Sequence, residues 1–229
     1  MTSQFTLLSD REIKELCSGD RPMLSPFNPE LIREVGGIGL EDFDAFGVPY
    51  EPKCKVISYG LSSYGYDLQL SPKRLRIFKK KPIWQQIGES SGLLKPQIID
   101  PKSFDESVLY DAKQYRDHTG IYWIQPPHSV SLGTTPTCFD MPHNLIGMAL
   151  GKSTYARCAV NPIVTPAEPR WKGHLTLEIV NNSDYDCKLY ANEGILQMIF
   201  LRGADCETNY SDRKGKYQDQ GEEVVLART

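Results

Sequence analysis

A succession of short β-rich runs fills the second half of the chain, and this pattern constrains the fold more than any other feature. From residue 121 onward the runs are IYWIQPP, SVSLGTT, LIGMALG, HLTLEIVN, CKLYANEG and ILQMIFLRG, each closed by Gly, Pro, Asn or Asp. Short runs at intervals of about ten residues are typical of a β-sandwich or barrel. HLTLEIV is the clearest, because in residues 174–180 leucine or isoleucine occupies every second position.

Two short helices are expected beside these strands. Residues 9–17 (SDREIKELC) place Ser9 at the N-cap and Glu12 at the capping-box position, and Gly19 follows as a stop. The second helix signal is STYARC, directly after Gly151. The expected fold is therefore mainly β with a few short helices.

The remaining segments are interpreted as strands, arms and a tail of one domain. Residues 64–70 and 75–78 read as two further strands. We expect a single domain over residues 1–229 with a β core at about 61–78 and 120–205. The Pro- and Gly-rich stretch at about 20–60 and the mixed polar stretch at about 80–118 are expected to be irregular arms, and 207–229 a flexible C-terminal tail.

Composition excludes several functional classes. The net charge of −3 leaves no strongly basic face for non-specific nucleic-acid binding, although a few cations can still hold a small polyanion. No apolar run approaches the roughly 18 residues of a membrane span, and the first residues lack the pattern of a signal peptide. The 6 cysteines contain no CxxC pair. We read them as reduced thiols of a cytoplasmic protein without nucleic-acid or membrane partners.

Known catalytic motifs are missing from the sequence. The 4 histidines show no HExxH spacing, and neither half of the H-x-E and P-C-x-x-C signature of zinc-dependent base deaminases is present. There is no GxSxG elbow, and the GKS at 151–153 lacks the glycine-rich lead of a phosphate-binding P-loop. The sequence therefore predicts neither a zinc site nor a serine nucleophile.

Three polar segments remain as candidates. In GKSTYAR (151–157), Ser153 and Thr154 lie at a helix start, where free N–H groups favour an anion, and Arg157 lies one turn on. An ordinary helix cap with a solvated arginine fits the same residues. In the tail, RKGKYQDQG (213–221) offers three cations, an aromatic ring and two amides, which could close over a triphosphate, although taken alone they favour a solubilising charged terminus.

The third candidate is the bend TPAEPRWKG (165–173) with the strand that follows it. Pro166 and Pro169 stiffen the turn. Glu168 and Glu178 then lie on two sides of the bend, so both side chains can face one pocket. Glu178 is a carboxylate in a leucine-rich strand, and the alternation also allows it to point to solvent.

Together these segments resemble the dCTP deaminase family of the dUTPase-like β-fold superfamily. GKSTYAR resembles the family's G-R/K-S-S/T-x-A-R segment, and EPRWKGHLTLEI its D-P-G-W/F-x-G-x-x-x-L-E segment, which places Glu178 on the catalytic glutamate. RKGKYQDQG resembles the A-K-Y-x-x-Q-x-G tail, and SSYGYDLQL an early strand in which Asp67 matches. The resemblance covers roughly residues 120–221 and implies a distorted β-barrel or jelly roll.

The resemblance also implies a mechanism and a set of site residues. Glu178 would shuttle the proton in the zinc-independent conversion of dCTP to dUTP and ammonia, with Arg157 and Ser153 orienting the glutamate and the water. Mg²⁺ would accompany the triphosphate, and relatives imply a homotrimer with sites between subunits and feedback inhibition by dTTP. The residues expected to bind the nucleotide are Lys152, Ser153, Thr154, Arg157, Glu168, Trp171, Tyr210, Lys216, Tyr217 and Gln220.

One departure keeps other functions open. Where much of the family has Asp before Pro-Gly, this chain has Glu168-Pro169-Arg170. In bifunctional relatives an acid at this place helps to activate water for triphosphate cleavage, and the longer side chain of Glu168 counts against a built-in dUTPase activity. Because a dUTPase shares the fold and the phosphate-binding tail, a bifunctional or pure dUTPase is still the first alternative. A non-catalytic nucleotide sensor on the same fold, or a deaminase of a monophosphate or a modified cytosine, are the others.

Overall fold

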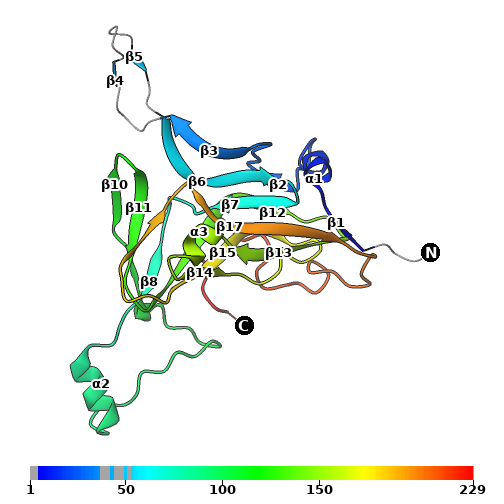
Figure 1. Ribbon diagram of the computed structural model, residues 1–229. Coiled ribbons are helices and arrows are strands. Elements are labelled where there is room, and N and C mark those ends of the chain that lie inside the picture. The colour runs from blue at the N-terminus through cyan, green and yellow to red at the C-terminus, as the bar shows by residue number, and fades with distance from the viewer. Residues whose placement is uncertain (1–4, 37–41, 44–48, 51–52, 229) are drawn as a thin grey trace.

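The computed structural model describes residues 5–36, 42–43, 49–50 and 53–228, and its strands form antiparallel sheets (Figure 1). A six-stranded sheet has the order β1-β17-β7-β6-β3, with β13 also paired to β17. Its strands are β1 (Thr6–Leu7), β3 (Leu31–Gly36), β6 (Lys53–Ser62), β7 (Gly65–Gln69), β13 (Leu145–Gly151) and β17 (Gly194–Arg202). The expectation of a mainly β chain is confirmed.

A second six-stranded sheet carries the strand of Glu178. Its order is β14-β15-β12-β8-β9, with β2 also paired to β12. Its strands are β2 (Leu24–Ser25), β8 (Arg76–Phe78), β9 (Leu109–Asp111), β12 (Ser129–Asp140), β14 (Val160–Ile163) and β15 (Lys172–Asn181). A smaller sheet has the order β10-β11-β16 and consists of β10 (Gln114–Asp117), β11 (Gly120–Gln125) and β16 (Cys187–Tyr190). In addition, β4 (Asp42–Phe43) pairs with β5 (Pro49–Tyr50).

The alternation predicted for residues 174–180 sets the two faces of β15. Leu175, Leu177 and Ile179 are buried in the core, where the largest enclosed side chains include Trp123 and Phe139. The residues between them point to the opposite face of the sheet, because successive side chains of a strand alternate. That opposite face is the one that carries Glu178.

The two helices expected from the sequence, near residues 9–17 and after Gly151, lie where the sequence places them. In α1 (Asp10–Leu16) the backbone N–H of Ser9 donates to the Glu12 carboxylate at 3.0 Å, and Ile13 is buried. The capping box therefore fixes the start of this helix, as predicted. The helix signal after Gly151 corresponds to the single turn α3 (Ser153–Ala156).

The two segments expected to be irregular arms contain regular structure. Within 20–60, β3 pairs with β6, which also pairs with β7, so much of this stretch belongs to the first sheet. The prolines and glycines of this stretch predicted irregular structure, because the sequence does not reveal the strands with which β3 and β6 pair. That pairing stabilises them as strands. Within 80–118, α2 (Ile83–Ser90) lies on an arm that projects from the body (Figure 1), and η1 (Glu106–Val108) precedes β9. In the described residues, no helix is long and apolar enough to cross a membrane.

Candidate active site

Glu178 lies in a cavity of about 830 Å³ between β15, the bend that precedes it and the C-terminal tail. Its neighbours in the sheet are Leu132 on β12 and Ile163 on β14. The side chain is half-buried, and desolvation raises the pKa of its carboxyl above the usual value. Glu178 thus faces a sheltered cavity, which decides between the two orientations that the alternation allowed.

The bend 164–171 forms one wall of this cavity. It is held by hydrogen bonds in both directions between Ala167 and Gly147 of β13, at 2.8 and 2.9 Å. Glu168 lines the cavity together with Glu178, as expected from their positions on the two sides of the bend. The Glu168 carboxylate also forms an ion pair with Arg213 of the tail. The acid of the bend is therefore already engaged by a cation.

Trp171 contributes mainly packing. Only 5% of it is exposed, and its ring lies 5.7 Å from that of Phe139. The indole N–H donates to the carbonyl oxygen of Tyr217 at 2.9 Å. Trp171 lines the cavity, and at the same time it ties the tail to the core.

The tail segment 210–220 docks beside β15. Gln220 donates its amide N–H to the His174 carbonyl at 2.6 Å and to the Thr176 hydroxyl at 3.2 Å, and accepts from the His174 N–H at 3.0 Å. The close approach requires Gly173, since a Cβ there would lie 2.8 Å from the Gln220 nitrogen. Within 210–220, Tyr210, Lys216 and Tyr217 also line the cavity.

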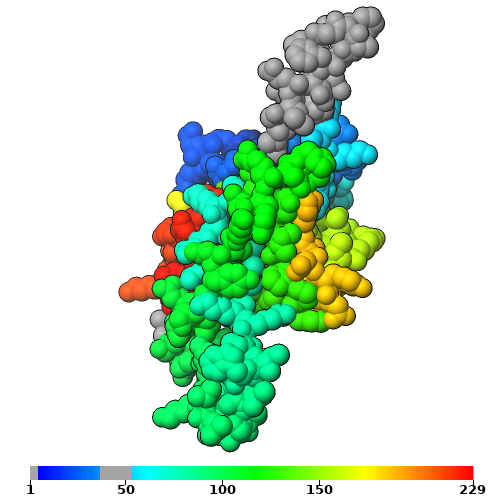
Figure 2. Space-filling view, turned by 90° about the vertical axis from the view of Figure 1, so that its left-hand side faces the viewer, coloured from blue at the N-terminus to red at the C-terminus, as the bar shows by residue number. Residues whose placement is uncertain are grey.

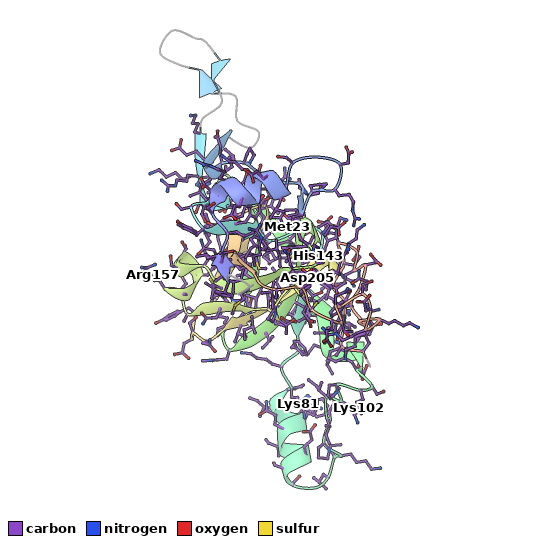
Figure 3. The ribbon with its side chains drawn as sticks, turned by 90° about the vertical axis from the view of Figure 1, so that its right-hand side faces the viewer. Met23, Lys81, Lys102, His143, Arg157 and Asp205 are labelled. Carbon is purple, nitrogen blue, oxygen red and sulfur yellow. The ribbon has the colours of Figure 1, made fainter. Side chains whose placement is uncertain are left out.

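The segment 152–157 lies away from this cavity within one chain. Lys152 forms a buried ion pair with Asp67, whose second carboxylate oxygen has no hydrogen-bond partner among the described residues. Thr154 lines a different cavity of about 660 Å³. Arg157 lies at the edge of the molecule (Figure 3), and its guanidinium donates to the Ser153 carbonyl at 3.2 Å. The ammonium of Lys152 is thus held by Asp67 and not presented to a phosphate.

The comparisons with known proteins agree with the motifs. A family model described as dCTP deaminase-like matches residues 53–203. The chain belongs to the dCTP deaminase family. A dCTP deaminase of Campylobacter fetus is 45% identical over 185 residues, which cover 78% of this chain and 88% of the relative. One of Paraburkholderia xenovorans is 37% identical over 225 residues, covering 98% of this chain and 100% of the relative.

A solved structure supports the fold assignment. The crystal structure of 2'-deoxycytidine 5'-triphosphate deaminase from Agrobacterium tumefaciens aligns with a TM-score of 0.50 at 14% sequence identity. The match covers 95% of this chain and 53% of that chain, so this chain spans about half of its length. At this identity the likeness concerns the fold alone, and it agrees with the β-fold expected for a dCTP deaminase.

Several cavity residues of this dCTP deaminase family member were missed at the sequence level. They include Phe78, Phe104, Leu132, Ile146, Val164, Leu175, Thr176, Val225 and Ala227. Leu132 could be found only from strand register, because it pairs with Glu178 across β12 and β15. In the described ranges, the cavity included, no cluster of three or more His, Cys, Asp or Glu side chains has the arrangement of a metal site.

Proposed function

We propose that this protein deaminates dCTP to dUTP and ammonia, with Glu178 as the proton shuttle. The observation that carries the proposal is the position of Glu178, a half-buried carboxyl with a raised pKa inside a cavity of about 830 Å³. Membership of the dCTP deaminase family supports the same substrate. The reaction would serve pyrimidine deoxynucleotide synthesis in the cytoplasm, as a source of the dTTP precursor dUTP.

The chemistry requires one group that can both accept and donate a proton. The Glu178 carboxylate removes a proton from the water that attacks C4 of cytosine and delivers it to N3. The same carboxyl then moves a proton from the new C4 hydroxyl to the amino group, which leaves as ammonia while the C4 carbonyl forms. Burial raises the pKa of Glu178 towards the working pH, and this favours such two-way transfer.

The phosphate end of the nucleotide is assigned to the tail. Lys216 lies 5.4 Å from the centre of the Tyr217 ring, and both residues line the Glu178 cavity. Lys216 would neutralise part of the triphosphate charge, and Gln220, whose amide ties the tail to β15, would hold this segment in place beside the nucleotide. Mg²⁺ would enter with the substrate as the counter-ion of its phosphates.

A homotrimer would complete the site. Ser153 and Arg157 are not among the residues that line the Glu178 cavity of their own chain, so they would orient a glutamate and its water when a second copy presents its cavity to them. The same arrangement would bring Thr154 near the phosphates of the neighbouring site. A dTTP molecule competing for this shared site would act as feedback inhibitor.

Product analysis distinguishes the proposal from its alternatives. Incubation with dCTP, dCMP, CTP and dUTP in the presence of Mg²⁺ should give dUTP and ammonia from dCTP alone. Release of dUMP and pyrophosphate would show a dUTPase, which the ion pair between Glu168 and Arg213 argues against. If a chelator abolished ammonia release and only Zn²⁺ restored it, the zinc-independent mechanism would be wrong.

A further inference from the structure

An aromatic wall of the Glu178 cavity comes from the two ends of the α2 arm, defined here as residues 79–103. Phe78 precedes the arm and Phe104 follows it, and both half-buried side chains line the cavity. Their ring centres lie 6.1 Å apart at an interplanar angle of 87°, the edge-to-face arrangement that aromatic pairs favour. The phenylalanines thus join the arm to the cavity that holds the proposed catalytic group.

Strand register directs Phe78 to the same sheet face as Glu178. Leu132 of β12 pairs with Glu178 on one side and with Arg76 of β8 on the other. Cross-strand partners share a face, and alternation returns Phe78 to the face of Arg76. The edge-to-face contact between Phe78 and Phe104 closes the arm at its base.

The other aromatic residues of the cavity are committed elsewhere. Trp171 is packed in the core against Phe139, and the Tyr210 hydroxyl accepts a hydrogen bond from the backbone N–H of Tyr217 at 3.1 Å. The Tyr217 ring lies near the cations of Lys216 and Arg228, at 5.4 and 5.3 Å from its centre. The two phenylalanines are therefore the rings best suited to an apolar part of the substrate.

We propose that Phe78 and Phe104 pack against the C5–C6 edge of the pyrimidine ring and restrict its size at C5. This inference rests on the proposed function, because Glu178 would occupy the N3 and C4 side of the ring. The C5 and C6 carbons are the only edge of cytosine without a hydrogen-bonding atom, so they are best placed against apolar side chains. Leu132, the register partner of Glu178 on β12, also lines the cavity and extends the same apolar surface.

The test compares Phe104→Ala with Trp84→Ala, using dCTP and 5-methyl-dCTP as substrates. Trp84 is a matched control, since it lies on the arm, is 68% exposed and does not line the cavity. Figure 2 shows the arm as a separate lobe of the surface, so loss of Trp84 changes the arm without opening the cavity. Phe104→Leu, which keeps apolar volume without the ring, serves if the alanine variant fails to fold.

Phe104→Ala should raise KM for dCTP about tenfold, equivalent to ~1.4 kcal/mol. It should also raise the ratio of kcat/KM for 5-methyl-dCTP to that for dCTP about tenfold. Inhibition of this variant by inorganic tripolyphosphate should stay within about twofold of wild type, and so should all values for Trp84→Ala. Phe104→Leu should shift the ratio in the same direction by about threefold. An unchanged ratio in the folded Phe104 variants, or an equal change in Trp84→Ala, would overturn the inference.

Failure of the proposed function would look different. If wild-type protein releases no ammonia from dCTP, calorimetry still measures the affinities for dCTP and for tripolyphosphate. Phe104→Ala should then weaken dCTP binding about tenfold and leave tripolyphosphate binding unchanged. Equal affinities of wild type and Phe104→Ala for dCTP would overturn the aromatic contact by itself.

Discussion

Replacing Gln220 by alanine tests how the tail is held over the Glu178 cavity. Gln220 is 8% exposed, and its side-chain amide makes two hydrogen bonds, at 2.6 Å to the His174 carbonyl and 3.2 Å to the Thr176 hydroxyl. Each such bond contributes about 0.5–1.5 kcal/mol net, so the loss of both should favour the undocked tail by about 1–3 kcal/mol. The undocked population should rise roughly 5- to 150-fold.

Amide hydrogen exchange measures this opening directly. The N–H groups of His174 and Asp219, which donate across the docked contact at 3.0 and 2.9 Å, should lose protection by the same factor. KM for dCTP should rise with it, because a closed tail is the state proposed to bind phosphate. Gln218→Ala is the control, since Gln218 donates one bond at 3.2 Å to the Arg170 carbonyl, and its buried amide oxygen has no partner in the part of the chain that the structure describes. Unchanged protection in Gln220→Ala, or an equal loss in Gln218→Ala, would refute the reasoning.

Two further predictions concern buried charge. Asp67→Asn leaves the Lys152 ammonium buried without its counter-ion, which should cost about 3–5 kcal/mol of stability. The melting temperature should fall by roughly 6–20 °C. A shift within about 2 °C in a thermal melt would contradict this prediction. The pKa of Glu178 is higher in the folded than in the unfolded protein. The contribution of this group to the free energy of unfolding is therefore fully present below the pKa of the unfolded state, and it is lost as the pH rises through the pKa of the folded state. Glu178→Gln should therefore unfold at higher urea than wild type at pH 8 and show no such gain at pH 4; equal urea midpoints at pH 8 would contradict it.

Local patterns in the sequence identify a large part of this fold. The capping box at Ser9 and Glu12 defines a helix by contacts within one turn, and the alternation of 174–180 defines a strand with one buried face. Both are short-range effects, so neither needs knowledge of the rest of the chain. The same holds for the bend at 165–173, which places Glu168 and Glu178 on one cavity.

The features that were not predicted from the sequence depend on contacts between residues far apart in the chain. Strands β3 and β6 exist because they pair with each other and with β7, and no local period reveals that. The ion pair of Lys152 joins it to Asp67, 85 positions away in the chain. Phe78 and Phe104 meet only because an arm leaves the body and returns to it. Where a chain comes back to itself is decided by tertiary packing, which overrides local propensity.

Ammonia release from saturating dCTP by Glu178→Gln, set against wild type, tests the central claim most directly. The amide keeps the size of the side chain but can neither accept nor return the proton, so the rate should fall by about 10²–10⁴-fold or more while calorimetric dCTP binding persists. If the variant retained turnover within about tenfold of wild type, proton transfer by Glu178 would be wrong.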